Sequence, residues 1–462
     1  MARRASIHCL LCVLCGCLCL SVSDRASAST PVQANAVIKS AHARQELDSS
    51  SRAPAPDAKT PEQTKTEQYT LSHERYQKAV AYSRAEYTLY FVYYFFSALV
   101  LILLLGLGVA AKFRDIAEDA SDNRWVQGLI FVPLLRLAID LLNLPLRLYW
   151  HALSVRYEQS IQGWGSWFGD WAKGEFLRTF FAIVIVLILF AVMRRSPRRW
   201  WLFFWFPAVV ILLGLIVITP LFIDPLFNKF EPLSKEHQDL VVSIERLTKH
   251  AGVPIPPERM FLMMASQKTN AINAYVTGLG ASKRVVVWDT TIRKTTNDEA
   301  LFIIGHELGH YVLGHVLEGA LLGAAGLLLA LYLLFRGLHW ALGRWGRDWK
   351  IYGPEDWASL AVLLLLLQVL MFVASPVINA VSRMQEHAAD VYGLEVIHGL
   401  IPNSEAVAAH AFQVIGELDL ADPNPPAVIK FWLYSHPPVA ERLVFAHSYD
   451  PWSKGNPPKY VK

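Results

Sequence analysis

Six apolar runs, each about as long as a bilayer is thick, constrain the fold of this chain more than any other feature. A transmembrane helix needs about 20 consecutive, mostly apolar residues. Runs of about that length lie near residues 89–111, 126–150, 175–193, 200–220, 314–336 and 357–378. With 53% hydrophobic and only 18% charged residues, the composition also departs from that of a soluble domain. The sequence therefore predicts an α-helical integral membrane bundle of about six spans in a lipid bilayer.

The second of these runs differs from the others because it carries charge. Arg136, Asp140 and Arg147 lie within it. Charged side chains in membrane segments almost always face protein or a water-filled cavity instead of lipid. We therefore expect this span to form part of the wall of a protein-lined cavity. The formal net charge of +4 is too small for a chain of 462 residues to indicate a nucleic-acid partner.

The N-terminus is typical of an exported protein. Residues 1–28 combine a basic start, a short apolar run and a small-residue exit, which predicts a secretory signal peptide. All five cysteines fall within the first 20 residues, so its cleavage would remove every thiol. An uncleaved anchor helix and a lipoprotein signal ending near Cys15 or Cys17 are the alternatives. Residues 29–70 contain few aromatic side chains and are expected to form a disordered linker.

The remaining chain divides into a transmembrane bundle at 71–225 and a second domain at 226–462, which the last two apolar runs interrupt. Within this second domain, residues 259–264, 273–279 and 284–292 have the composition of short strands. Gly278, Gly280 and Ser282 favour a hairpin between the last two strands. We expect a small β-sheet beside the bundle, and helices broken by proline-rich loops over 382–448.

Residues 303–315, IIGHELGHYVLGH, form the first motif with a chemical meaning. Thr296 and Glu299 have the spacing of a capping box, so a helix is predicted to begin there and run through the motif. On that helix His306 and His310 lie one turn apart, with Glu307 beside them. Zinc hydrolases use H-E-x-x-H to present two imidazoles to the metal and a carboxylate to its water. A helix with buried, hydrogen-bonded histidines is the alternative interpretation.

A second block, NAVSRMQEHAAD at 379–390, supplies candidate partners for the motif. Glu386 and Asp390 lie four residues apart on a second predicted helix. Glu386 could give the metal an oxygen ligand, and Asp390 could accept a hydrogen bond from a ligand imidazole. Two histidines and one glutamate leave a fourth position for water, as in catalytic zinc sites.

Several other residues near these motifs could be mistaken for ligands. A metzincin is excluded because positions 313 and 316 lack the glycine and histidine that it requires. His315 is expected to lie well round the helix from His310, in a packing or supporting role. His387 is expected to face away from the site. Arg383 and Arg442 are expected to pair with carboxylates.

Three blocks, GHELGHYVLGH, NAVSRMQEHAAD and YSHPPVAERL, together resemble the hallmark blocks of the CAAX prenyl proteases of type I. These are multi-spanning membrane metallopeptidases of the gluzincin type, related to bacterial heat-shock membrane proteases. IDPLFNKFEPL at 223–233 and INAYVTG at 272–278 are also similar to that family, so the likeness extends over about 70–448. It implies a large chamber among the membrane helices and a zincin-like metalloprotease domain at 226–462 that contains the small sheet.

The resemblance also implies a role for each matched residue. It implies a single zinc ion whose protein ligands are His306, His310 and Glu386. Glu307 is implied as the general base, Asp390 as a support for the ligands, and His436 as a stabiliser of the oxyanion. A strand at Asn273 and Ala274 would hold the substrate backbone. An extended peptide can add to such a sheet edge through main-chain hydrogen bonds.

Basic residues in two loops predict which side of the membrane the site faces. They are Arg194, Arg195, Arg198 and Arg199 after the third run, and Arg336, Arg344, Arg347 and Lys350 around the loop after the fifth. The positive-inside rule assigns both loops to the cytoplasm. The metal site is then expected on the extracytoplasmic side of the membrane, which we expect to be a bacterial inner membrane. This differs from the eukaryotic relatives of the family, which are understood to face the cytosol.

Together these patterns predict a membrane-embedded zinc metalloendopeptidase. Its expected substrates are polypeptides that are lipid-modified or lie close to the membrane. The expected reaction is CAAX-like cleavage of these polypeptides or their hydrolysis in membrane protein quality control. A transporter, or a catalytically idle scaffold that binds a ligand in its chamber, is the alternative. A scaffold, however, has no need of a general base such as Glu307.

Overall fold

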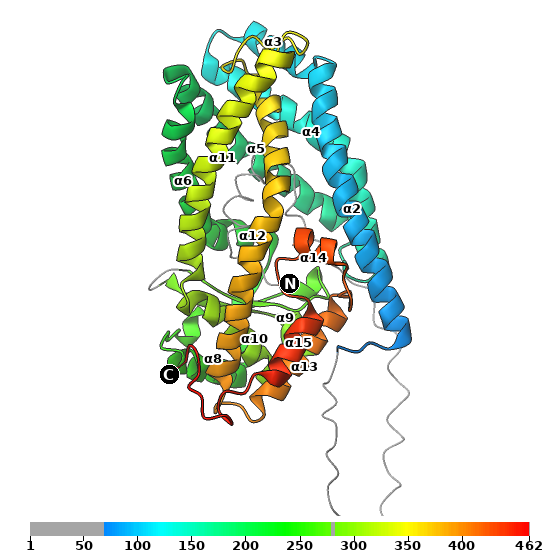
Figure 1. Ribbon diagram of the computed structural model, residues 1–462, viewed down its shortest axis with the longest axis vertical. Helices are drawn as coiled ribbons and strands as arrows, with labels where there is room; N and C mark the ends of the chain where they lie inside the picture. Colours follow the sequence, from blue (N-terminus) through cyan, green and yellow to red (C-terminus); the bar gives the residue numbers. More distant parts are fainter. Residues whose placement is uncertain (1–68, 279–281, 462) are drawn as a thin grey trace, which may run out of the picture.

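The computed structural model describes residues 69–278 and 282–461 (Figure 1). The predicted signal peptide at 1–28 and nearly all of the predicted linker at 29–70 lie outside the described residues. Six described helices are long and apolar enough to cross a membrane, which confirms the predicted helical bundle. They are α2 (His73–Gly106), α4 (Arg124–Arg156), α5 (Trp164–Arg195), α6 (Trp200–Ile218, extended to Phe227 by a π-helical turn and α7, Asp224–Phe227), α11 (His315–Trp345) and α12 (Ser359–Ile397).

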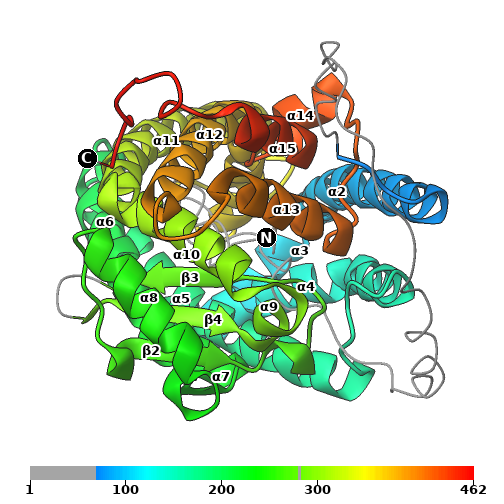
Figure 2. The same cartoon turned by 90° about the horizontal axis from the view of Figure 1, so that it is seen from below.

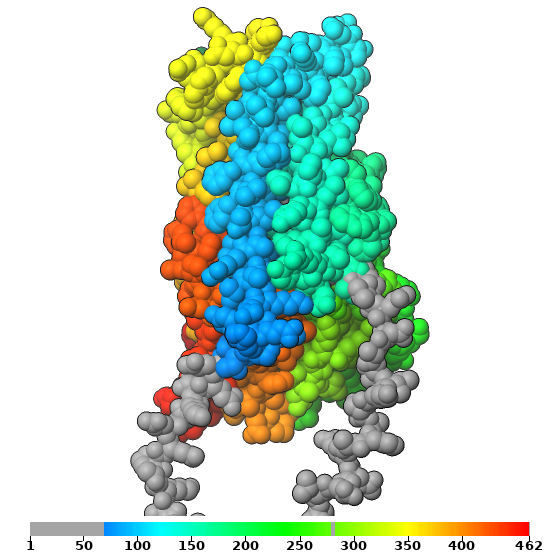
Figure 3. All heavy atoms as spheres, turned by 90° about the vertical axis from the view of Figure 1, so that its right-hand side faces the viewer, coloured from blue at the N-terminus to red at the C-terminus, as the bar shows by residue number. Residues whose placement is uncertain are grey.

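The last span continues beyond its apolar part as one helix. The sequence suggested a separate helix for the block that contains Glu386, because the hydrophobic run ends near residue 378. In the structure α12 runs without interruption for 39 residues, with Pro376 inside it, so the membrane span and the carboxylates share one rigid element. Similarly, α2 begins at His73, well before the first run, and continues into that run as far as Gly106. Figure 3 shows α2 as a continuous column along one face of the molecule.

The charges of the second span are paired and buried, so they face protein instead of lipid, while the protein-lined cavity that the sequence predicted beside them stays a prediction. In α4, Asp140 lies 2.9 Å from Arg136 and 2.7 Å from Arg147, and Arg136 also lies 2.9 Å from Glu175 of α5. All three α4 side chains are at most 5% exposed. Because unpaired charge in such a place is costly, this network specifies how α4 and α5 pack.

The two basic loops lie together at one end of the bundle. Arg194, at the end of α5, lies over the ring of Trp357 in the loop before α12, 5.5 Å from its centroid. The short helix α3 (Val109–Ala120) is at the same end, where Arg114 lies 2.6 Å from Asp356. The β-sheet and the helices around it occupy the opposite end (Figure 1).

A four-stranded mixed sheet with the order β1-β2-β4-β3 lies at that opposite end. Its strands are β1 (Phe230–Pro232), β2 (Met260–Met263), β3 (Ala274–Thr277) and β4 (Arg284–Trp288). The predicted hairpin is confirmed, because β3 and β4 pair antiparallel, whereas β2 and β4 are parallel. The sequence did not indicate β1, which has only three residues. The order places β3 at an edge of the sheet.

The end of the molecule that contains the sheet has its own hydrophobic core, separate from that of the membrane bundle. Helix α10 (Asn297–Val312) lies in the middle of this end, with the sheet and α8 (Gln238–His250) on one side (Figure 2). Helices α13 (Ser404–Leu418) and α15 (Val439–Ser448) lie on its other side (Figure 2). Buried side chains from α10, including Phe302 and Ile304, join Phe412 of α13 and Leu394 of α12 in this core. The motif helix is therefore fixed by packing on several sides.

Candidate metal centre

Helix α10 begins where the sequence predicted. The Thr296 hydroxyl accepts a hydrogen bond from the Glu299 amide at 3.3 Å, and the Glu299 carboxylate accepts one from the Thr296 amide at 2.8 Å. This reciprocal capping box satisfies two amides that would otherwise have no helical partner. It fixes the residue at which α10 begins, and this determines on which side of the helix His306 and His310 lie.

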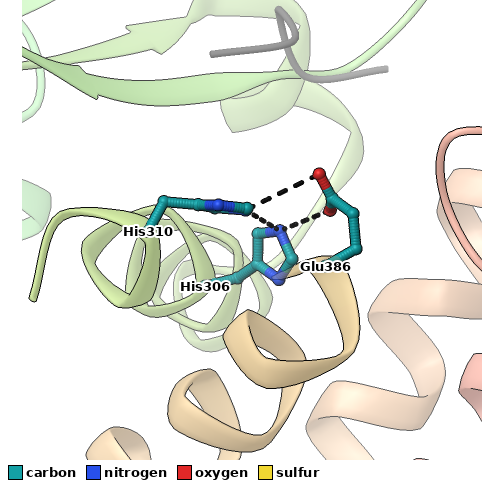
Figure 4. Close-up of side chains that lie close together, drawn as sticks. All are labelled: His306, His310 and Glu386. Atoms are coloured by element: carbon teal, nitrogen blue, oxygen red, sulfur yellow. Dashed lines mark hydrogen bonds and ion pairs between the residues drawn. The ribbon is translucent and has the colours of Figure 1, made fainter. Parts of the chain in front are cut away.

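Three side chains from two helices meet at one point (Figure 4). His306 Nε2 and His310 Nε2, both from α10, lie 3.2 Å apart. From α12, Glu386 places one oxygen 3.2 Å from His306 Nε2 and the other 3.7 Å from His310 Nε2. One ligand atom from each residue lies within 4.8 Å of the other two, which is close enough for all three to hold one metal ion.

The two helices can approach this closely because glycines line their contact. A Cβ atom built on Gly393 of α12 would lie 3.0 Å from the backbone nitrogen of His306. One built on Gly309 of α10 would lie 3.1 Å from Tyr392 Cβ. Larger residues would separate α10 from α12 and thereby move Glu386 away from the histidines. The glycine inside HELGH is the sequence signal for this contact.

The chemistry of the cluster fits a divalent metal ion. Two imidazole nitrogens face each other, although each neutral ring has only one N–H to donate. The Glu386 Oε2 atom is buried and has no aligned hydrogen-bond donor among the described residues, despite nitrogens at 3.1 and 3.2 Å. Glu307 and Asp390 add two further buried carboxylates, and the Arg442 guanidinium contacts Asp390. A cation would satisfy both the lone pairs and the surplus negative charge.

Asp390 connects His306 to the C-terminal helices. Its Oδ1 atom lies 2.9 Å from His306 Nδ1, at ion-pair distance although the ring nitrogen is not aligned for a hydrogen bond. Arg442 of α15 contacts both oxygens of Asp390, at 2.9 and 2.5 Å. Burial alone would lower the pKa of His306, but Asp390 and Glu386 together raise it to about 10. Asp390 therefore lies beside the ring nitrogen of His306, and the hydrogen bond that the sequence suggested between them stays a prediction.

Glu307 is buried one residue away from His306 on α10 and is only 8% exposed. Burial raises the pKa of Glu307, and the charge of Glu386 acts in the same direction, while His306 and His310 act against it. A carboxylate that is held in an apolar environment and has a raised pKa is a stronger proton acceptor than an exposed one.

His436 approaches the same carboxylate from the loop before α15. Its Nε2 atom lies 3.1 Å from Glu386 Oε2. Side chains of α12 hold this loop, since Arg383 donates to the carbonyl of Tyr434 at 2.6 Å. The expectation that Arg383 pairs with a carboxylate was therefore wrong, because its donors reach main-chain carbonyls of residues 430 and 434. The sequence gives no local signal for such a long-range contact.

Asn273 and Ala274 lie at the start of the edge strand β3, which packs against α10. The Asn273 carbonyl accepts a hydrogen bond from the Trp288 amide at 3.0 Å, and the Asn273 amide donates to Thr291. Because main-chain groups of an antiparallel strand alternate in direction, those of Ala274 and Val276 point away from β4, toward the open edge. The Asn273 side-chain nitrogen is buried without a hydrogen-bond partner among the described residues.

The two remaining histidines take different positions. His387 packs against the Phe445 ring, with centroids 4.7 Å apart, and so faces away from the cluster as expected. The sequence suggested that His315 lies well round the helix from His310, and this was wrong. The helix α10 ends at Val312, and Gly314 adopts a φ of +75°. The break returns the His315 ring to His310, and their Nδ1 atoms lie 3.1 Å apart.

Comparisons with known proteins show the family to which the chain belongs. The family model of Peptidase family M48 matches residues 234–449, and that of the CAAX prenyl protease N-terminal region, described as five membrane helices, matches residues 56–229. The uncharacterized metalloprotease YhfN of Bacillus subtilis is 36% identical over 369 residues, which cover 80% of this chain and 84% of that protein. The chain belongs to the CAAX prenyl protease family of M48 peptidases. It is therefore a multi-span membrane metalloprotease, and the transporter and scaffold alternatives are not favoured.

Two further relatives of this M48 peptidase extend the comparison. The CAAX prenyl protease 1 homolog of Dictyostelium discoideum is 32% identical over 235 residues, which cover 49% of this chain and 51% of that protein. The crystal structure of S. mikatae Ste24p is similar with a TM-score of 0.67 and 24% identity, over 81% of this chain and 88% of that one. The second likeness shows that the two chains share a fold.

Proposed function

We propose that this M48 peptidase is a zinc-dependent endopeptidase whose metal ligands are His306, His310 and Glu386. The observation that carries the proposal is the convergence of three ligand residues from α10 and α12, among which Glu386 has a buried oxygen without a hydrogen-bond partner in the described part of the chain. Two imidazoles and one carboxylate form the ligand set of catalytic zinc sites that keep a position for water. When bound, zinc would supply Lewis-acid chemistry, activating water and polarising the scissile carbonyl.

The surrounding side chains supply the proton transfers and the charge stabilisation. Glu307 takes the proton of the attacking water and passes it to the amine that leaves, for which its buried position and raised pKa are suited. His436, whose Nε2 atom lies 3.1 Å from Glu386, donates to the negative charge that develops on the substrate carbonyl. Asp390 orients His306.

The substrate binds as an extra strand along β3. The outward main-chain groups of Ala274 and Val276 hold an extended peptide beside α10, and Asn273 offers its amide nitrogen, which has no partner among the residues described, to the same peptide. Because several relatives carry the name CAAX prenyl protease, we infer a lipid-modified or membrane-proximal polypeptide as the substrate class. Residues 226–462 form the peptidase domain, which α11 and α12 join to the bundle at 71–225.

A comparison of Glu307→Gln with the wild type tests the proposed reaction. Both purified proteins are incubated with a prenylated CAAX peptide and with an unfolded protein, with and without chelator. The variant should bind zinc but lose cleavage, because only the proton acceptor is removed. Cleavage that survives in Glu307→Gln would exclude Glu307 as the base, and zinc binding without hydrolysis of either substrate by the wild type would argue against the peptidase assignment.

We further propose that the metal centre faces away from the cytoplasm of a bacterial inner membrane. The two basic loops share one end of the bundle, as the cation–π contact of Arg194 with Trp357 illustrates, and α10, which carries His306 and His310, lies at the other end. Single cysteines at Ser196 and Ser282, in a variant whose five native cysteines are serine, can be labelled with an impermeant thiol reagent in intact cells. Labelling at Ser282 alone is expected. Labelling at Ser196 alone would reverse the orientation.

A further inference from the structure

We propose that His315 is a positioning residue that holds His310 in the tautomer whose Nε2 atom faces the metal. The proposal rests on the proposed function, because it takes His310 as a ligand. The His310 ring has two distinct neighbours. Its Nε2 atom faces His306 Nε2 at 3.2 Å and Glu386 at 3.7 Å, whereas its Nδ1 atom faces His315 Nδ1 at 3.1 Å.

A break in the backbone creates this contact. In a continuous helix, a residue five positions after His310 would point about 140° away from it. Here α10 ends at Val312, Gly314 has a φ of +75°, and α11 begins at His315. The rings of His310 and His315 consequently meet with centroids 5.1 Å apart and planes at 70°.

The first turn of α11 is held in place by α12. Gln385, the residue before Glu386, donates a hydrogen bond to Glu318 at 2.9 Å. Glu318 lies one turn after His315 on α11, so the hydrogen bond fixes the turn that carries His315. His315 itself is only 6% exposed, and its ring therefore has little freedom to leave His310.

The placement of protons follows from the geometry. A neutral imidazole has one N–H group and one nitrogen lone pair. If His310 Nε2 directs its lone pair at a metal, its Nδ1 atom carries the proton and donates it to a hydrogen bond. His315 Nδ1 is the acceptor at 3.1 Å, so the His315 proton lies on Nε2. The two ligand histidines thus have different supports, since a carboxylate stands behind His306 and an imidazole behind His310.

The test compares His315→Leu with His315→Gln in the full-length protein. Leucine cannot accept a hydrogen bond, whereas the side-chain oxygen of glutamine can. Zinc affinity is measured by competition with a chromophoric chelator, and the unfolding temperature of the metal-depleted protein is recorded alongside. We expect His315→Leu to lose roughly 10–100-fold in zinc affinity, and His315→Gln to retain most of it. His339→Leu is the matched control, because His339 lies on the same helix and contacts the Phe335 carbonyl.

Three results would overturn the proposal, and they can be told apart. Wild-type zinc affinity in His315→Leu would show that His310 needs no such partner. Equal losses in the leucine and glutamine variants would show that size, not hydrogen bonding, matters at this position. Failure of the wild type itself to bind zinc would contradict the proposed zinc site, and with it the role of His315. Should His315→Leu unfold, His315→Met replaces it, because methionine matches the length of glutamine but accepts hydrogen bonds only weakly.

Discussion

Arg442 contacts both carboxylate oxygens of Asp390, with its Nε and Nη2 atoms at 2.9 and 2.5 Å. The same carboxylate lies 2.9 Å from His306 Nδ1. Helix α15, which supplies Arg442, is thereby linked through Asp390 to a candidate metal ligand on α10. Because two N–H groups of one guanidinium contact the two oxygens, the Asp390 carboxylate is held in one orientation beside the histidine ring.

The first prediction concerns Asp390→Asn. The amide keeps the shape of the carboxylate but removes the charge that faces His306, so we expect zinc affinity to fall roughly 10–100-fold. Competition with a chromophoric chelator measures the change. Asp239→Asn is the control, because Asp239 is exposed on α8. An affinity equal to that of the wild type would mean that Asp390 only anchors Arg442.

The second prediction concerns the close contact between α10 and α12. A methyl group at position 393 would lie 3.0 Å from the backbone nitrogen and 3.2 Å from the Cα atom of His306, neither of which can rotate away. Gly393→Ala should therefore destabilise the fold by about 1–3 kcal/mol and weaken zinc binding. Gly343→Ala in α11 is the control, since a Cβ atom there meets nothing within 4 Å. Thermal unfolding in detergent provides the measurement, and equal stability of the two variants would contradict the packing argument.

The third prediction tests strand addition at β3. Proline at position 276 removes an amide that points toward the open edge, and an edge strand can accommodate proline there. We expect Val276→Pro to raise KM for a peptide substrate with a smaller effect on kcat. Tyr275→Pro should instead destabilise the sheet, because the Tyr275 amide points toward β4. An unchanged KM in Val276→Pro would place the substrate elsewhere.

The fourth prediction concerns the end of α12. Glu395 is buried and accepts hydrogen bonds from the Tyr449 hydroxyl and from the amides of residues 459–461. Glu395→Gln replaces one acceptor oxygen with a donor, which leaves some of these part-buried amides without an acceptor and should cost about 1–3 kcal/mol. The unfolding temperature should fall accordingly, while Glu236→Gln, at an exposed position, should leave it unchanged. No decrease would show that the C-terminal segment contributes little to stability.

Local patterns in the sequence predicted the parts of this structure that depend on local physics. Hydrophobic run length predicted the spans, and the capping box of Thr296 and Glu299 predicted the start of α10. The pairing of the H-E-x-x-H motif with Glu386 predicted the cluster.

Features that depend on tertiary context were missed. The continuity of α12 through Pro376 could not be inferred from hydropathy. The second half of α12 is stabilised by packing in the hydrophobic core at the end that contains the sheet. The contact of His315 with His310 depends on the helix break at Gly314, which the apolar pattern of the segment does not predict. A glycine at that point was the one available signal, since it tolerates the positive φ that breaks the helix.

The most direct test of the central claim is diffraction from the purified protein, recorded at and below the zinc absorption edge. A single anomalous peak bonded to His306, His310 and Glu386, with Zn–N distances of about 2.0–2.1 Å, is the predicted result. A map with no peak at this cluster, or a peak that Glu386 does not reach, would contradict the account.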